Sequence, residues 1–584
     1  MSERDDDVHV RLGRIRDRRT GKPKPFVHQV LRAAKKAGSG EVSGRRLAGS
    51  GCSGFGRGRT AFSRSRLFSP QRRVIVKARI VRGGSRRARS APLTAHLSYL
   101  KRDGVTRDGA RGRMFDSRGD DVDDRAFAER CGEDRHNFRF IISPEDAGEM
   151  SDLRAFTRDL ATQMETDLGT RLDWIAIDHW NTDNPHVHLI VRGVADDGRD
   201  LVIARDYISR GLRSRAEDLV SLELGPKPEQ QIRSALERDV EAERWTKLDT
   251  AITLEVDKTG MVDLRPVGAG AGDPQIRRLM VGRLQRLERM GLASPAGPSR
   301  WTLSPDAEPI LRDFGVRGDI IKTMHNALAA RGLERPPGDY VIEGSATTKP
   351  IVGRLLEKGL YDELNGDVYA VIDGVDGRVH HVRFRGLDAM EHAAPEGGIV
   401  EVRRFGGQQE RTPTLLLISR SDSDLAHQVT TPGATWLDHR LVSNDDASFA
   451  HGGFGAEART AINARIERLI DEGLARRQGQ RVIFARNLLD TLRRRELDAE
   501  GTQLAAELNR PYRPTQSGNE VGGVYQRRLN LSSGRFAMLD DGLGFSLVPW
   551  SPSLERQLGR QVTGIARSDG GVDWTFGRNR DLGL

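Results

Sequence analysis

The chain has 584 residues, of which 37% are hydrophobic and only 5% aromatic. This length exceeds what a single hydrophobic core serves, so we expect several domains. The sequence has no apolar run of transmembrane length, its first residues lack the apolar stretch of a signal peptide, and two cysteines cannot form a disulfide framework. These features argue against membrane insertion and against a disulfide-stapled secreted protein, and they predict a cytoplasmic one.

The formal net charge of +10 is unevenly distributed along the chain. The first 100 residues hold 25 Lys and Arg against 6 Asp and Glu, a net of +19, whereas the remainder is net −9. Such a basic block favours polyanions through counterion release, although a solvated tail is the plain alternative. We expect residues 1–70, which are rich in Arg, Gly and Ser, to form a largely disordered basic leader beside a nucleic-acid-binding domain.

Apolar periodicity predicts six elements between residues 71 and 240. In chain order they are a strand at 72–83, a helix at 93–104, a strand at 136–146, a helix at 152–169, and strands at 174–179 and 186–194, after which a turn leads to a further apolar segment at 201–208. This order predicts an α+β domain over residues 71–240, built from an antiparallel sheet with helices on one face.

The C-terminal half contains a recurring helix and hairpin pattern. Residues 283–303 and 464–484 each read as a helix, a glycine stop and a short hairpin, at a fixed offset of 182. The pattern is typical of winged-helix DNA-binding modules, although two unrelated amphipathic units would look similar. The expected modules are winged-helix-like at 245–315 and 430–500, and β-rich and small-barrel-like at 316–425 and 505–584.

Three histidines fall within ten residues, in the segment IAIDHWNTDNPHVHLIVRG at 175–193. His186 and His188 are two apart on a predicted strand and therefore project from one face, and His179 can face them across the hairpin. Three imidazoles suit a divalent ion that acts as a Lewis acid on a phosphate oxygen, but they would suit zinc equally well. The spacing therefore predicts a metal site without naming a reaction.

Two residues upstream are candidates for chemistry beside that metal. Tyr99 lies on the predicted helix at 93–104, and as a nucleophile its phenol would need a nearby base or a cationic environment. Ser143 ends a predicted strand, where its hydroxyl could bind a phosphate or a 3′-OH. Ordinary packing of the tyrosine and a Ser-Pro turn that starts a helix are the simpler interpretations.

Taken in chain order, three segments resemble the motifs of a known enzyme family. These segments are HLSYLKRDG, FRFIISPED and HWNTDNPHVHLIV. They are similar to the three motifs of conjugative relaxases, the mobilisation nucleases of the His-hydrophobe-His endonuclease superfamily, of the type with an N-terminal tyrosine represented by the agrobacterial T-DNA nickase. The resemblance covers residues 72–240, and the C-terminal half resembles the long accessory region of such relaxases.

The resemblance implies a metal-dependent tyrosine nuclease that nicks and rejoins one DNA strand. His179, His186 and His188 would hold Mg²⁺ or Mn²⁺, and Tyr99 would attack the scissile phosphate to leave a 5′-phosphotyrosine and a free 3′-OH. Ser143 would help to position the DNA. One departure is that the basic leader places Tyr99 far from the N-terminus, which makes Tyr207 a rival nucleophile.

Further site residues are expected around this centre. Asp178 or Asp183 would orient an imidazole or accept the tyrosyl proton, and Arg102 and Arg192 are candidate phosphate contacts. The implied partners are single-stranded DNA at a transfer origin, accessory proteins of the relaxosome and the coupling protein of a type IV secretion system. The protein would act in the bacterial cytoplasm and could travel with the DNA into a recipient cell.

Two other functions stay open at this point. A rolling-circle replication initiator of the same superfamily would share the chemistry, but its tyrosine usually follows the histidines, which would favour Tyr207. A regulator with several winged-helix modules would bind DNA without cutting it and would use the histidines for structural zinc.

Overall fold

The computed structural model describes residue 67 and residues 69–82, 93–101, 105–180, 184–256, 260–265, 273–343, 350–390, 392–405, 414–443, 449–479, 481–516, 518–567 and 571–575. The predicted basic leader lies almost wholly outside the described residues. The chain divides into two compact units, Met1–Asp319 and Ile320–Leu584, and each is considered by itself. No helix in the described ranges is long and apolar enough to cross a membrane.

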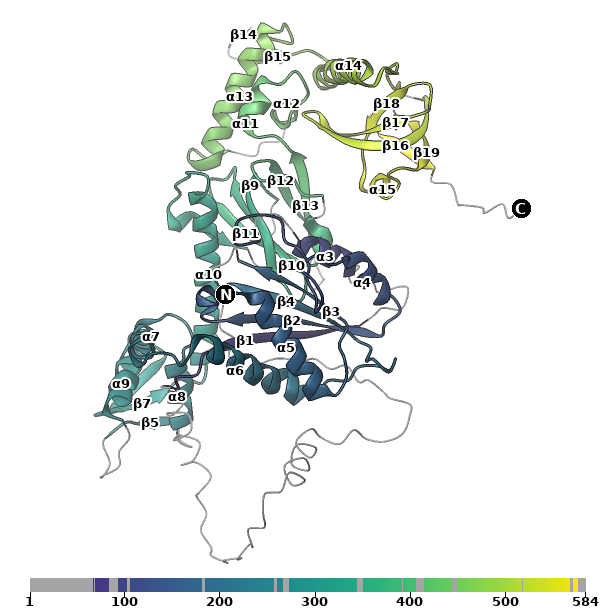
Figure 1. The fold of residues 1–584 in the computed structure, drawn as a ribbon. Coiled ribbons are helices and arrows are strands. Elements are labelled where there is room, and N and C mark those ends of the chain that lie inside the picture. Colours follow the sequence, from purple (N-terminus) through teal and green to yellow (C-terminus); the bar gives the residue numbers. More distant parts are fainter. Residues whose placement is uncertain are drawn as a thin grey trace, which may run out of the picture. The chain divides into compact units, whose positions relative to one another are not determined.

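The first unit contains a four-stranded antiparallel sheet (Figure 1). Its strands are β1 (Val74–Arg82), β2 (His136–Pro144), β3 (Trp174–His179) and β4 (His186–Arg192), in the order β1-β2-β4-β3. Every neighbouring pair is antiparallel, so the predicted α+β class and the antiparallel sheet are confirmed.

One face of this sheet packs on two long helices, α5 (Leu153–Leu168) and α6 (Leu212–Leu224). In each strand every second residue faces these helices, because successive side chains of a strand point to opposite faces of the sheet. Helix α5 is capped by Asp152 at its start and ends at Gly169, whose φ of 68° is left-handed. Its apolar stripe, including Phe156, Leu160 and Met164, lies on the sheet.

Helices also pack on the opposite face, so the expectation of helices on one face is wrong. Leu97 and Leu100 of α3 (Leu93–Leu100) and Phe127 of α4 (Asp124–Arg130) form a second core with Ile175, Ile177 and Ile190. The second face of β3 and β4 is apolar over these positions and therefore needs its own cover. This cover brings α3 to the end of the sheet that carries the histidines.

The apolar segment at 201–208 forms no strand. Leu201 and Ile203 are buried and Val202 is 65% exposed, so the burial alternates as in a strand. The chain instead turns into a π-helical segment, η2 (Tyr207–Gly211), which continues into α6. The alternating residues add apolar side chains to the core under α5 and α6.

A second body of the first unit follows the sheet. It comprises α7 (Glu229–Glu241), α8 (Lys247–Glu255), β5 (Met261–Asp263), α9 (Pro274–Arg289), β6 (Ala293–Gly297) and β7 (Arg300–Leu303), and α10 (Ala307–Ala329) begins within it. Ile232 and Leu236 of α7 share a core with Leu284 and Leu287 of α9. Helix α7 therefore belongs to this body and not to the sheet domain, which was predicted to reach residue 240.

The second unit contains two sheets separated by helices (Figure 1). The first sheet comprises β8 (Tyr340–Ile342), β9 (Ile351–Asp362), β10 (Asp367–Gly374), β11 (Val379–Phe384), β12 (Ile399–Phe405) and β13 (Thr414–Ser421), with η3 (Pro337–Asp339) before it. The helices are α11 (Leu425–Thr430), α12 (Trp436–Val442), α13 (Gly453–Asp471) and α14 (Leu488–Leu508), and β14 (Ala475–Gln478) and β15 (Arg481–Phe484) form a hairpin. The second sheet comprises β16 (Glu520–Leu531), β17 (Gly534–Asp540), β18 (Phe545–Pro549), β19 (Gln561–Ala566) and β20 (Val572–Thr575).

Apart from the edge strand β8, which pairs with β11 in the first sheet, the two sheets of this unit have the same topology. The five shared strands have the orders β13-β12-β9-β10-β11 and β20-β19-β16-β17-β18, so the first of the five in sequence is central in both. A short helix joins the third and fourth strands in each, η4 (Leu387–Met390) and α15 (Pro552–Glu555). Gly353 and Gly523 occupy matching positions, where a Cβ would lie 2.2 Å and 2.7 Å from the carbonyl oxygens of Asp373 and Asp540.

The helical bodies before the two sheets also match each other, around one buried arginine. Arg283 of α9 is fully buried and binds both carboxylate oxygens of Asp249, each at 2.8 Å. Asp249 also closes a capping box with Thr246 at the start of α8. The remaining guanidinium donors bind the carbonyl oxygens of Val240, Ala242 and Arg244.

The aligned arginine of the second body makes the same contacts. Arg465 of α13 binds both oxygens of Asp438 at 2.9 Å, and Asp438 closes a capping box with Thr435. Its other donors bind the carbonyl oxygens of Val429, Thr431 and Gly433. The offset of 182 residues seen in the sequence thus marks two copies of one helix and hairpin arrangement, each followed by a sheet of one topology.

We predict that Arg465→Ala lowers the free energy of unfolding of the second body by about 3–5 kcal/mol, because it leaves Asp438 as a buried, unpaired charge. Amide hydrogen exchange of α12 and α13 in the full chain measures this loss. The matched control is Arg477→Ala, which removes an exposed ion pair with Glu467 and should cost about 1 kcal/mol or less. Equal effects of the two substitutions would contradict the prediction.

Candidate metal centre

The three histidines of the hairpin lie together on one face of the first sheet. His179 of β3 pairs directly with His186 of β4, and His188 pairs with Ile177. The ring centroids lie 4.6–5.4 Å apart, and one ring nitrogen from each histidine lies within 4.8 Å of the others. All three side chains are buried, with at most 3% exposed. The predicted convergence of the three imidazoles is therefore present.

Backbone carbonyls determine which nitrogen of two rings carries the proton. His179 Nε2 lies 2.9 Å from the carbonyl oxygen of Leu100, and His186 Nδ1 lies 3.0 Å from that of Asn184. A carbonyl can only accept, so both nitrogens donate. In the neutral rings this leaves the lone pairs on His179 Nδ1 and His186 Nε2, which is the arrangement that commonly orients metal-binding histidines.

The donor set fits a divalent ion. His186 Nε2 and His188 Nε2 are 3.2 Å apart, a separation that suits two nitrogens bound to one ion at about 2.1 Å each. All-nitrogen ligation by three residues leaves positions open for water or for a phosphate oxygen. Manganese, magnesium and zinc remain compatible with this set, so the geometry supports a metal site and does not select the ion.

Of the two candidate tyrosines, only Tyr99 is on an element that contacts the histidines. Tyr99 is half-buried on α3, and the next residue, Leu100, accepts the hydrogen bond from His179. Tyr207 lies in the core under α5 and α6, on the opposite face of the sheet, and donates to Asp167 at 3.0 Å. Burial, together with the Asp167 carboxylate, raises the pKa of Tyr207 well above its ordinary value.

Ser143 lies on the histidine face at the end of β2. Its neighbour Ile142 pairs with Val187, which places Ser143 beside the start of β4. The hydroxyl donates to the carbonyl oxygen of Pro185 at 3.2 Å and the side chain is only 2% exposed. Ser143 therefore ties β2 to the residue before His186.

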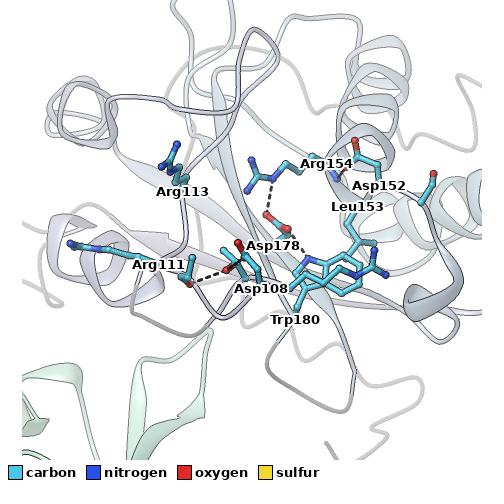
Figure 2. Close-up of a pocket in the computed structure, with 12 residues that line it drawn as sticks. Asp108, Arg111, Arg113, Asp152, Leu153, Arg154, Asp178 and Trp180 are labelled. Carbon is cyan, nitrogen blue, oxygen red and sulfur yellow. Dashed lines mark hydrogen bonds and ion pairs between the residues drawn. The ribbon is translucent and has the colours of Figure 1, made fainter.

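Asp178 lies on the other face of β3 and does not contact an imidazole, which contradicts its expected role. Its carboxylate accepts from Arg154 Nε at 2.9 Å and from Trp180 Nε1 at 2.7 Å (Figure 2). The physical reason is the alternation of a strand, since neighbours such as Asp178 and His179 point to opposite faces. Asp183, the alternative, lies outside the described residues.

The two arginines expected at the phosphate have different outcomes. Arg192 is held in a two-point ion pair with Asp134, at 2.7 Å and 3.0 Å, at the far end of β4. It lies four residues beyond His188, about 13 Å along the strand, so a direct contact to a phosphate at the histidines is not supported. Arg102 lies outside the described residues.

Sequence reasoning missed three cations on the histidine face. The apolar residues of β1 with even numbers face α5 and α6, so Lys77 and Arg79 point to the side of the histidines. Arg139 of β2 pairs directly opposite Arg79. Burial, with the neighbouring Arg79, lowers the pKa of Arg139 to about 10. For Lys77 and Arg79, the alternation of apolar residues in the sequence of β1 already indicated that both side chains lie on one face of the strand.

Comparison with known proteins places the chain in one family. The family model described as a protein of unknown function, DUF3363, matches residues 280–416 and 407–583, which together exceed half of the chain. The chain belongs to this family. Neither the curated proteins nor the solved structures contain a significant match. The family region covers most of the duplicated arrangement and excludes the histidine-bearing sheet.

We predict that His186→Ala and His188→Ala each weaken Mn²⁺ binding by more than about 100-fold, because loss of an orienting partner alone costs 10–100-fold and a ligand matters more. Isothermal titration calorimetry on the full chain measures the affinity. His325→Ala is the control, since His325 is an exposed residue of α10. Unchanged binding by both ligand variants would exclude this site.

Proposed function

We propose that this protein is a DNA relaxase that nicks and rejoins one strand at the transfer origin of a plasmid or mobile element. The observation that carries the proposal is the hydrogen bond from His179 to the carbonyl of Leu100. This bond joins the helix of Tyr99 to the metal-binding face, although the two segments are 79 residues apart in the chain. The tyrosine that we propose as the nucleophile thus lies on a helix that is hydrogen-bonded to one of the histidines.

The charge of the histidine face supports a polyanionic substrate. Lys77, Arg79 and Arg139 lie on the β1 and β2 part of this face. Ile141 of β2 lies between this part and the histidines, because it pairs with Lys77 on one side and with His188 on the other. Two arginines placed directly opposite each other repel, and a bound phosphate chain would relieve that repulsion. We infer that the same face would offer both a metal site and phosphate contacts.

The chain's own residues would act in the following way. The phenolic oxygen of Tyr99 would attack the phosphorus and form a P–O bond to the tyrosine. The bond to the 3′ oxygen would break, and this oxygen would take up a proton from water to leave as a free 3′-OH. A divalent ion held by the three histidines would supply Lewis-acid stabilisation of the phosphate. His96, which is one turn before Tyr99 on α3 and only 2% exposed, would accept the phenolic proton in the role first expected of Asp178. Because the phosphotyrosine conserves a phosphodiester, the reverse step rejoins the strand.

The remaining modules would serve recognition. We infer that the two helix and hairpin bodies are winged-helix modules that bind duplex DNA beside the nick, with accessory proteins of a relaxosome and a type IV coupling protein as further partners. The protein would act in the cytoplasm. A rolling-circle initiator remains the second candidate by chemistry, but the burial of Tyr207 away from the histidines disfavours the tyrosine order typical of that group.

The proposal is tested by incubating the protein with labelled single strands from the DNA around its gene and Mg²⁺ or Mn²⁺. We expect a covalent adduct on a denaturing gel with the wild type, none with Tyr99→Phe and little with His186→Ala. Tyr207→Phe, which removes the hydrogen bond to Asp167 on the other face of the sheet, should retain the adduct. Loss with Tyr207→Phe but not with Tyr99→Phe would reverse the assignment, and no adduct with any strand would favour the DNA-binding regulator.

A second prediction concerns the basic strand face. Lys77→Ala and Arg79→Ala should each weaken the binding of single-stranded DNA and lower the slope of log K against log salt by about 0.7. Fluorescence anisotropy at several salt concentrations measures both quantities. Arg199→Ala is the control, since Arg199 is an exposed residue with its side chain 87% accessible. Identical slopes for all three variants would exclude this face as a phosphate contact.

A further inference from the structure

A cleft of about 400 Å³ opens at the end of β3 (Figure 2). Its walls are the segment 106–113, the first residues of α5, and the side chains of Asp178 and Trp180. This cleft is separate from the metal-binding face, because Asp178 and Trp180 are the neighbours of His179 and point the other way.

The segment that forms one wall is fixed to β3 at both ends. Phe115 exchanges two backbone hydrogen bonds with Ala176, at 2.9 Å and 2.8 Å, and Trp180 donates its backbone N–H to the carbonyl of Val105 at 2.7 Å. Between these points the chain carries three exposed arginines, Arg107, Arg111 and Arg113. They project from an anchored segment, so their positions beside the cleft are set by the sheet.

An aromatic ring forms the floor of the cleft and is held in place. The indole N–H of Trp180 donates to Asp178, which also accepts from Arg154 of α5. The guanidinium of Arg107 lies 4.4 Å from the centroid of the Trp180 ring. A half-buried tryptophan under an arginine plane is a stacking platform for a planar base.

The charges around the cleft favour an anion. Of its three carboxylates, Asp178 offsets Arg154, Asp152 caps α5, and Asp108 accepts the hydroxyl of Thr106. The arginines of the segment 106–113 supply the positive charge that faces solvent. A ligand that combines a planar ring with a phosphate satisfies both features, and a nucleotide is such a ligand.

We propose that this cleft binds one nucleotide of the substrate DNA strand, next to the phosphate held at the histidines. This inference rests on the proposed function. Residues 178, 179 and 180 are consecutive, with Cα atoms about 3.8 Å apart. A DNA strand that passes over the end of β3 would therefore reach both the cleft and the histidines within a few nucleotides. The base of this nucleotide would stack with the Trp180 ring and the Arg107 guanidinium. The phosphate of the nucleotide would bind Arg111 or Arg113.

The test measures anisotropy of labelled (dT)20 and of any strand that forms the tyrosyl adduct. Trp180→Ala and Arg107→Ala should weaken binding about tenfold or more, the range expected for loss of one stacked base, whereas Trp180→Phe should retain most of the affinity. Arg528→Ala is the matched control, because Arg528 lies over Trp550 in a similar arrangement. Wild-type Mn²⁺ binding by Trp180→Ala would show that this variant is folded. If Trp180→Ala does not fold, Arg107→Ala provides the test.

Abasic sites introduced one at a time into the nicked strand locate the stacked base. We expect one position near the nick at which the abasic site weakens wild-type binding but has no further effect on Trp180→Ala. Unchanged affinity of both variants for (dT)20 overturns the cleft assignment, even if the adduct forms. Weakened (dT)20 binding without any adduct supports the cleft and rejects the nuclease instead. If free thymidine monophosphate competes fully with (dT)20, the cleft binds free nucleotides, and its assignment to a DNA strand is overturned.

Discussion

The pairing register of β3 with β4 is the constraint on which the first unit depends. His179 lies directly opposite His186, and the same register sets Ile175 and Ile177 beside Ile190 and His188. A slip of one residue would turn one strand's whole set of side chains to the other face. The core under α3 and α4 and the cluster of three histidines therefore depend on the same register, because the apolar and the imidazole side chains lie on one face of the sheet.

The cover of the second sheet face follows from this constraint and supplies the partners of the histidines. Helix α3 packs its leucines on the isoleucines of β3 and β4, and its last carbonyl then accepts from His179. Buried polar groups are costly unless hydrogen-bonded, so this contact also anchors the helix end. The helix that carries Tyr99 is thus positioned by core packing and by the hydrogen bond from His179 together.

The duplicated bodies rely on a different interaction, a buried arginine that joins three segments. Arg283 and Arg465 each link the capping box of one helix to the carbonyls that end the preceding segment. A buried ion pair adds little net stability compared with apolar packing, but removing one partner is expensive. Such a network selects one arrangement of helices over others, which explains why the same contacts occur twice in a chain whose two copies differ widely in sequence.

The sequence by itself determined the features that depend on local periodicity. Alternation predicted β1 to β4, helical spacing predicted α5, the spacing of His179, His186 and His188 predicted a metal site, and the offset of 182 predicted a repeated body. The basic leader, Arg102 and Asp183 fall outside the described residues. Only the tertiary structure decided which side chains meet: Asp178 binds Arg154 and Trp180, Arg192 binds Asp134, and Tyr207 is buried under α5. These partners come from distant segments or from the opposite sheet face.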